Sequence, residues 1–175
     1  MDNVRVLILA AGKSTRMKSK YAKVLHRAGG RTLIEHSIAA ARGVSPNISV
    51  VVGHSAEQVK ATVPEVSFVE QKEQLGTGHA VLAAREGFSG YSGDVLVMPG
   101  DVPLITTETL QAFLKFHRDG GFEASVLTAD IENPSGYGRI VRRSNSEVDS
   151  IVEHRDASPE VLKIHEINSG IYVFN

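Results

Sequence analysis

Short apolar runs rich in β-branched residues alternate along this chain with segments whose apolar residues recur at helical spacing. The strand-like runs lie at residues 4–9, 48–52, 66–70, 94–98 and 124–129, then in a hairpin of 139–142 with 147–152, and last at 171–174. Strands that alternate with helices favour a mainly parallel sheet with helices packed on its faces. We therefore predict an α/β fold, with a mainly parallel mixed sheet flanked by helices.

Side chains that can accept hydrogen bonds from unpaired backbone N–H groups mark the expected helix starts. Thr32 with Glu35, and Ser55 with Gln58, both have the spacing of a capping box. Thr77 is expected to be the N-cap of a further helix. These signals predict helices between the strands, as the alternating pattern requires.

Composition narrows the classes of protein and partner. The 175 residues carry a net charge of only −1, so we expect neither nucleic acid nor an anionic membrane surface as a partner. The absence of cysteine excludes disulfides, thiolate metal sites and cysteine nucleophiles. The sequence shows neither a membrane-spanning run nor a signal peptide, so we expect a cytoplasmic protein of one domain. It does not indicate an oligomeric state.

The first strand runs directly into a small-residue loop that is followed by cations. Leu9, Ala10, Ala11 and Gly12 end the strand, and five basic residues follow them, at Lys13, Arg16, Lys18, Lys20 and Lys23. Small residues at the carboxyl end of a strand let a base and ribose lie against the backbone, and Arg16 and Lys23 could then reach phosphates. A solvated basic loop is the alternative. A P-loop is excluded, because its first glycine is replaced by a strand residue, Leu7.

A second glycine-containing segment follows the third predicted strand. Gln71 precedes the sequence Gln74-Leu75-Gly76-Thr77-Gly78. Gly76 permits close approach of backbone, and a glutamine amide can read both a donor and an acceptor on a pyrimidine edge. An ordinary strand-to-helix turn remains the alternative.

Asp101 follows the buried run 94–98 and should lie at the same sheet edge as the first loop. A lone carboxylate at the mouth of a nucleotide site is a suitable Mg²⁺ ligand, because Mg²⁺ takes one or two protein carboxylates together with phosphate oxygens and water. The alternative is an aspartate that initiates the turn before Pro103.

Three polar positions near the end of the chain suit a polyhydroxylated ligand. Gly138 lies in a turn, Glu153 follows the predicted strand 147–152 and Asn168 precedes the last predicted strand. Carboxylates accept from hydroxyl groups, and amides can bind an acetamido group. A solvated Glu153 paired with Arg155 is the alternative.

The segment 9–17, the lysine at 23 and the motifs around Gln71, Asp101, Gly138 and Asn168 occur in one order along nearly the whole chain. This ordered set resembles the sugar nucleotidyltransferase family, in particular the uridyltransferase half of bacterial bifunctional N-acetylglucosamine-1-phosphate uridyltransferase/glucosamine-1-phosphate acetyltransferases. The resemblance implies a Rossmann-like nucleotide-diphospho-sugar transferase fold over residues 1–175, shortened at its C-terminus, without an acetyltransferase domain. The chain departs from the family at Ser14, where glycine is usual, and at Ala22, where proline is usual.

The resemblance also implies a role for each matching residue. Arg16 and Lys23 would be catalytic, Asp101 would bind Mg²⁺, and Gly138, Glu153 and Asn168 would bind the amino-sugar phosphate. The nucleotide would contact Leu9, Ala10, Ala11, Gly12, Gln71, Gly76 and Thr77.

The implied reaction transfers a uridylyl group from UTP to N-acetylglucosamine 1-phosphate and yields UDP-N-acetylglucosamine and pyrophosphate. In the family, a second metal ligand lies beyond the stretch that matches this chain. Two alternatives stay open: a nucleotidyltransferase for another nucleotide and sugar, and a non-catalytic module that binds nucleotide sugars.

Overall fold

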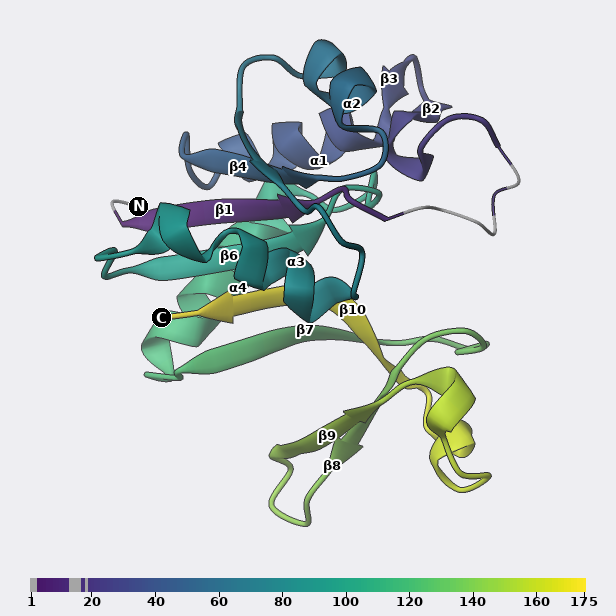
Figure 1. Ribbon diagram of the computed structural model, residues 1–175. Helices are drawn as coiled ribbons and strands as arrows, with labels where there is room; N and C mark the ends of the chain where they lie inside the picture. Colours follow the sequence, from purple (N-terminus) through teal and green to yellow (C-terminus); the bar gives the residue numbers. More distant parts are fainter. Residues whose placement is uncertain (1–2, 13–16, 18) are drawn as a thin grey trace. The chain divides into compact units, whose positions relative to one another are not determined.

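The computed structural model describes residues 3–12, 17 and 19–175. These residues form two compact units, one made of the chain up to Ala124 together with Val173–Asn175, and the other of Ser125–Tyr172. Figure 1 follows the chain through both units. None of the described helices is long and apolar enough to span a membrane.

Unit 1 contains four parallel strands in the order β5-β4-β1-β6, where β1 is Val4–Leu9, β4 is Ile48–Val52, β5 is Ser67–Glu70 and β6 is Asp94–Pro99. In β1, Val6, Leu7 and Ile8 are all buried. Burial of consecutive residues is typical of a central parallel strand covered on both faces. The predicted strands of this unit are therefore confirmed, with ends that differ by at most one residue.

Helices cover both faces of this four-stranded part, as Figure 1 shows with α3 on the near face and α4 on the far one. The helices of unit 1 are α1 (Leu33–Arg42), α2 (Ala56–Thr62), α3 (Thr77–Ala83) and α4 (Thr107–Asp119), with 3-10 turns η2 (Lys23–Leu25) and η3 (Arg85–Phe88). The Thr107 hydroxyl donates to the Ala40 carbonyl at 2.9 Å, which fastens α4 to α1. A short hairpin of β2 (Arg27–Ala28) and β3 (Arg31–Thr32), which the sequence did not predict, precedes α1.

The capping predictions had mixed outcomes. The Thr32 box is confirmed, since the Thr32 hydroxyl accepts from Glu35 N and the Glu35 carboxylate accepts from Thr32 N. Ser55 is the N-cap of α2, but its side chain makes no capping hydrogen bond, so the second box was wrong. Thr77 was wrong as an N-cap, because Gly76 occupies that position and α3 begins at Thr77.

Unit 2 contains antiparallel strand pairs, unlike the four-stranded parallel part of unit 1. Its strands are β7 (Ala124–Asp130), β8 (Arg139–Arg142), β9 (Val148–Val152) and β10 (Glu166–Phe174), and its 3-10 turns are η4 (His154–Asp156) and η5 (Val161–Lys163). Strand β10 pairs with β7 and, in antiparallel fashion, with β8, which forms the predicted hairpin with β9. Strand β7 begins in unit 1, and strand β10 ends there. The last strand begins at Glu166, five residues before its predicted start.

Candidate active site

The carboxyl ends of β1 and β6 form the floor of the site in unit 1. Gly100 N donates to Leu9 O at 2.9 Å, and Ala10 N donates to Val51 O at 2.9 Å, so the loop after β1 starts from a fixed backbone. Ala10 and Ala11 are buried, whereas Gly12 is exposed, with open space where a side chain would stand. A backbone edge is therefore accessible beside the strand end, as expected for a nucleotide loop.

Gly100 lets the two strand ends pack closely. A Cβ atom at this position would lie 3.3 Å from the Ile8 side chain, from Leu9 O and from the Val24 side chain. Val24 is itself buried, and it anchors the 3-10 turn η2 against the strand ends. This packing brings Lys23, the first residue of η2, to the same sheet edge as Asp101.

Lys23 and Asp101 form an ion pair across this edge. The Lys23 ammonium lies 2.6 Å from the Asp101 carboxylate, and the two side chains are 43% and 24% exposed. One pocket is lined by Leu9, Ala10, Gly12, Ala22, Lys23, Val24 and Asp101. Because both charges remain accessible from the pocket, an anion and a divalent cation could each reach a partner there.

Gln71 and Gly76 lie next to each other on the segment between β5 and α3. The Gln71 side-chain amide donates to Gly76 O at 3.3 Å and lies 3.0 Å from Nδ1 of His79. Gly76 has φ 106° and ψ 179°, a conformation that is essentially restricted to glycine. Thr77 is exposed at the first turn of α3. Sequence reasoning missed His79, since only the folded turn brings its ring to Gln71.

Arg16 lies outside the described residues, so its predicted role stays a prediction. Asp101 agrees with a magnesium site of one carboxylate, because Mg²⁺ commonly keeps several waters and takes further oxygens from substrate phosphates. The described part of the chain contains no cluster of three or more metal-binding side chains.

The three predicted sugar-binding residues come together within unit 2. Asn168 N donates to Gly138 O at 2.9 Å, and a Cβ atom at Gly138 would lie 3.4 Å from Oε1 of Glu153. A small residue at 138 therefore leaves room beside the Glu153 carboxylate, which is exposed. The cluster combines an acceptor, an amide and a glycine whose missing side chain avoids close contact with Ile151 and Glu153, which suits a sugar.

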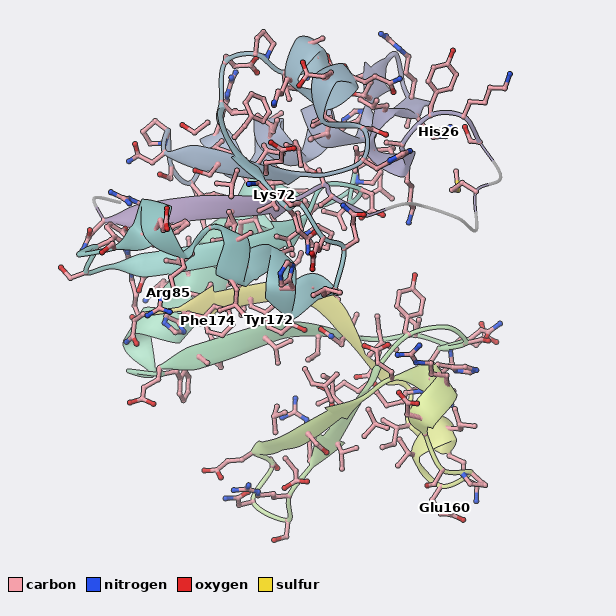
Figure 2. The ribbon with its side chains drawn as sticks, in the orientation of Figure 1. His26, Lys72, Arg85, Glu160, Tyr172 and Phe174 are labelled. Atoms are coloured by element: carbon pink, nitrogen blue, oxygen red, sulfur yellow. The ribbon has the colours of Figure 1, made fainter. Side chains whose placement is uncertain are left out.

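Tyr172 joins this cluster, although sequence reasoning did not predict it (Figure 2 labels it). The Asn168 side chain donates to the Tyr172 hydroxyl at 2.7 Å, and its carbonyl oxygen accepts from Gly170 N at 2.9 Å. Burial raises the pKa of the Tyr172 phenol; the bond from Asn168 opposes this rise, and the charge of Glu153 adds to it. The amide of Asn168 is thus fixed in orientation, which suits a group that recognises a ligand.

A sequence profile for the MobA-like NTP transferase domain matches residues 6–159. The chain belongs to this family. The match includes the strand-end loop, Lys23, Gln71, Asp101, Gly138 and Glu153.

Curated relatives are similar over nearly the whole chain. The bifunctional protein GlmU of Alkaliphilus oremlandii is 51% identical over 174 residues, which is 98% of this chain and 38% of that protein. GlmU of Clostridium tetani is 46% identical over 97% of this chain, and GlmU of Clostridium novyi is 49% identical over 97%. The chain spans well under half the length of these relatives.

A solved structure confirms the fold class. A putative glucose-1-phosphate thymidylyltransferase from Bacillus anthracis superposes with a TM-score of 0.75 over 98% of this chain and 71% of its own, at 19% sequence identity. The chain therefore has the nucleotide-diphospho-sugar transferase fold, a mixed and mostly parallel sheet flanked by helices.

Proposed function

We propose that this chain transfers a uridylyl group from UTP to N-acetylglucosamine 1-phosphate and releases pyrophosphate. The observation that carries the proposal is the Lys23–Asp101 pair in a pocket at the carboxyl ends of β1 and β6. Identity of about half to GlmU proteins supports the choice of substrates.

The chemistry is substitution at the α-phosphorus of UTP. A phosphate oxygen of the sugar 1-phosphate forms a bond to this phosphorus, while the bond to the oxygen that bridges to the β-phosphate breaks. Pyrophosphate leaves with that electron pair. Because the attacking oxygen is already ionised, no general base is required, and the rate depends on positioning and on neutralising charge.

Lys23 supplies a positive charge beside the phosphates, and Arg16 is proposed to supply a second. Asp101 would hold Mg²⁺, which neutralises phosphate charge when it is bound. Gln71, Gly76 and the loop Leu9–Gly12 would bind the base and ribose, with Thr77 beside the nucleotide. Gly138, Glu153 and Asn168 would bind the sugar, with Tyr172 fixing the amide of Asn168.

Pyrophosphate release tests the proposal. The purified chain is incubated with Mg²⁺, N-acetylglucosamine 1-phosphate and, in turn, UTP, dTTP, CTP or GTP. We expect release with UTP and much less with CTP and GTP. Faster release with another nucleotide would reassign the substrate, and binding of UDP-N-acetylglucosamine without any release would favour a binding module.

A further inference from the structure

The side chain of Gln71 is buried, and its amide faces two hydrogen-bonding groups while its backbone is bound to β4. It is 3% exposed, its backbone N–H donates to Val52 O at 2.8 Å, and its side-chain nitrogen faces both Gly76 O and His79 Nδ1. A buried amide that is bound at this many points cannot rotate without losing hydrogen bonds. The turn therefore fixes the orientation of the Gln71 amide.

Two acceptors determine which end of the amide faces inward. Gly76 O is a carbonyl and can only accept, so the amide NH₂ group must face it. The reversed amide would place two oxygens 3.3 Å apart. Since the same NH₂ group lies 3.0 Å from His79 Nδ1, that nitrogen must also accept. Nδ1 of His79 is therefore assigned as an acceptor, which places the ring proton on Nε2.

Both N–H bonds of Gln71 are used in this arrangement. Within the described residues, no hydrogen bond reaches its Oε1, so the side chain can offer a ligand only an acceptor. Uracil presents a donor at N3, whereas N3 of cytosine carries no hydrogen and would face this oxygen with a second acceptor. A site built to accept a base N–H strongly disfavours a base that lacks it.

We infer that His79 is a positioning residue for base selection, because it fixes Gln71 so that Oε1 reads an imide N–H. The inference rests on the proposed function, since it assigns how the proposed base-binding residues distinguish uridine from cytidine nucleotides. His79 does not touch the base and acts through Gln71. Without His79 only the bond to Gly76 O holds the amide, so a rotation that breaks this single bond would turn the NH₂ group toward the acceptor of a cytosine.

The first test needs no ligand. Nitrogen NMR of the free protein with ¹⁵N-labelled histidine reports which ring nitrogen carries the proton, and assignment uses the His79→Asn variant. We expect His79 at neutral pH to be the neutral form with the proton on Nε2. A proton on Nδ1 would overturn the inference and would leave the proposed reaction untouched.

The second test measures base discrimination by calorimetric titration with UTP and CTP in the presence of Mg²⁺. His79→Leu removes the acceptor and should lower the ratio of the CTP to the UTP dissociation constants by about tenfold. His79→Asn carries an acceptor at the position of Nδ1 and should restore most of the ratio. His36→Leu is the matched control, since His36 bonds Ala28 O at 2.8 Å and should leave the ratio unchanged.

A double-mutant comparison separates positioning from a general loss of structure. In a Gln71→Leu background, His79→Leu should not change the ratio further, because the two residues act as one unit. A wild-type ratio retained by His79→Leu, or a further loss in the double variant, would overturn the inference alone. A wild-type protein that does not distinguish UTP from CTP would instead contradict the uridine assignment, and the inference with it.

Discussion

In the proposed reaction, Lys23 is the described residue that would neutralise phosphate charge most directly. Lys23→Met keeps the aliphatic stem but removes the charge that lies 2.6 Å from Asp101. We expect turnover to fall by about a hundredfold or more, because stabilisation of developing phosphate charge is lost. The fold should lose less than about 1 kcal/mol, since the ion pair is partly exposed.

Pyrophosphate release and urea unfolding measure the two effects of Lys23→Met separately. Lys115→Met is the control, because Lys115 forms a comparable surface pair with Asp119 on α4. Full activity of Lys23→Met would show that the lysine is only a surface charge.

We expect position 76 to require glycine because of its backbone conformation. Its φ of 106° with ψ 179° strains any residue that has a Cβ atom, although the space around it is open. We expect Gly76→Ala to lower the free energy of unfolding by about 1–3 kcal/mol. Gly78→Ala, within α3 and also in open space, should be neutral or slightly stabilising. Equal unfolding midpoints in urea for the two variants would contradict this account.

Part of the candidate site could be predicted residue by residue from the sequence. The meeting of Lys23 and Asp101 at one sheet edge could be predicted, because residues beyond the carboxyl ends of parallel strands lie together, whereas their roles stay predictions. His79 and Tyr172 could not, since each acts through a side chain that only tertiary packing brings close. The Arg16 prediction remains untested.

Among the elements, β8 and β10 are joined by a two-pronged ion pair. Nε and Nη2 of Arg142 donate to the two carboxylate oxygens of Glu166 at 2.7 and 2.5 Å. This bond lowers the pKa of Glu166 below its usual 4.5 despite an opposing effect of burial, and it raises the pKa of Arg142. A carboxyl whose folded pKa is lowered stabilises the fold above its unfolded pKa, and this contribution disappears as the pH falls through the folded value.

The lowered pKa of Glu166 predicts how the stability of Glu166→Gln, relative to the wild type, changes with pH. At pH 7 the variant should be less stable than the wild type by about 0.5–1 kcal/mol, because the pair is partly exposed. The difference should shrink once the pH falls below 4.5 and vanish when Glu166 is protonated. Urea unfolding at several pH values measures it. Glu160→Gln, an exposed site in the same unit, should show no such trend; a pH-independent difference for Glu166→Gln would exclude the ion pair as the cause.

Element predictions succeeded where local chemistry and packing agree. The Thr32 box formed because Thr32 is extended, with φ −69° and ψ 158°, whereas Ser55, with φ −109° and ψ 31°, makes no side-chain capping bond. The start of β10 was missed because Asn168, Ser169 and Gly170 are poor strand formers. Pairing with neighbouring strands overrides this preference, with Gly170 at φ 78° absorbing the local irregularity.

For the whole molecule, the alternation of strands and helices was sufficient to predict the mixed sheet, and the solved structure with a TM-score of 0.75 confirms it. The division into two compact units could not be predicted, because no linker or change of composition marks residue 124. The chain spans about 38% of the length of the GlmU relative from Alkaliphilus oremlandii. Uridylyl transfer by this stretch alone is therefore proposed and needs its own assay.

The proposed role of Asp101 in Mg²⁺-dependent uridylyl transfer is tested by initial rates of pyrophosphate release. The rates are measured with UTP and N-acetylglucosamine 1-phosphate across Mg²⁺ concentrations, for the wild type and Asp101→Asn. We expect the wild type to require both substrates and Mg²⁺, and Asp101→Asn to lose about a hundredfold or more in rate while UTP binding without metal persists. Release by Asp101→Asn at the wild-type rate and with the same Mg²⁺ dependence would contradict the proposed role.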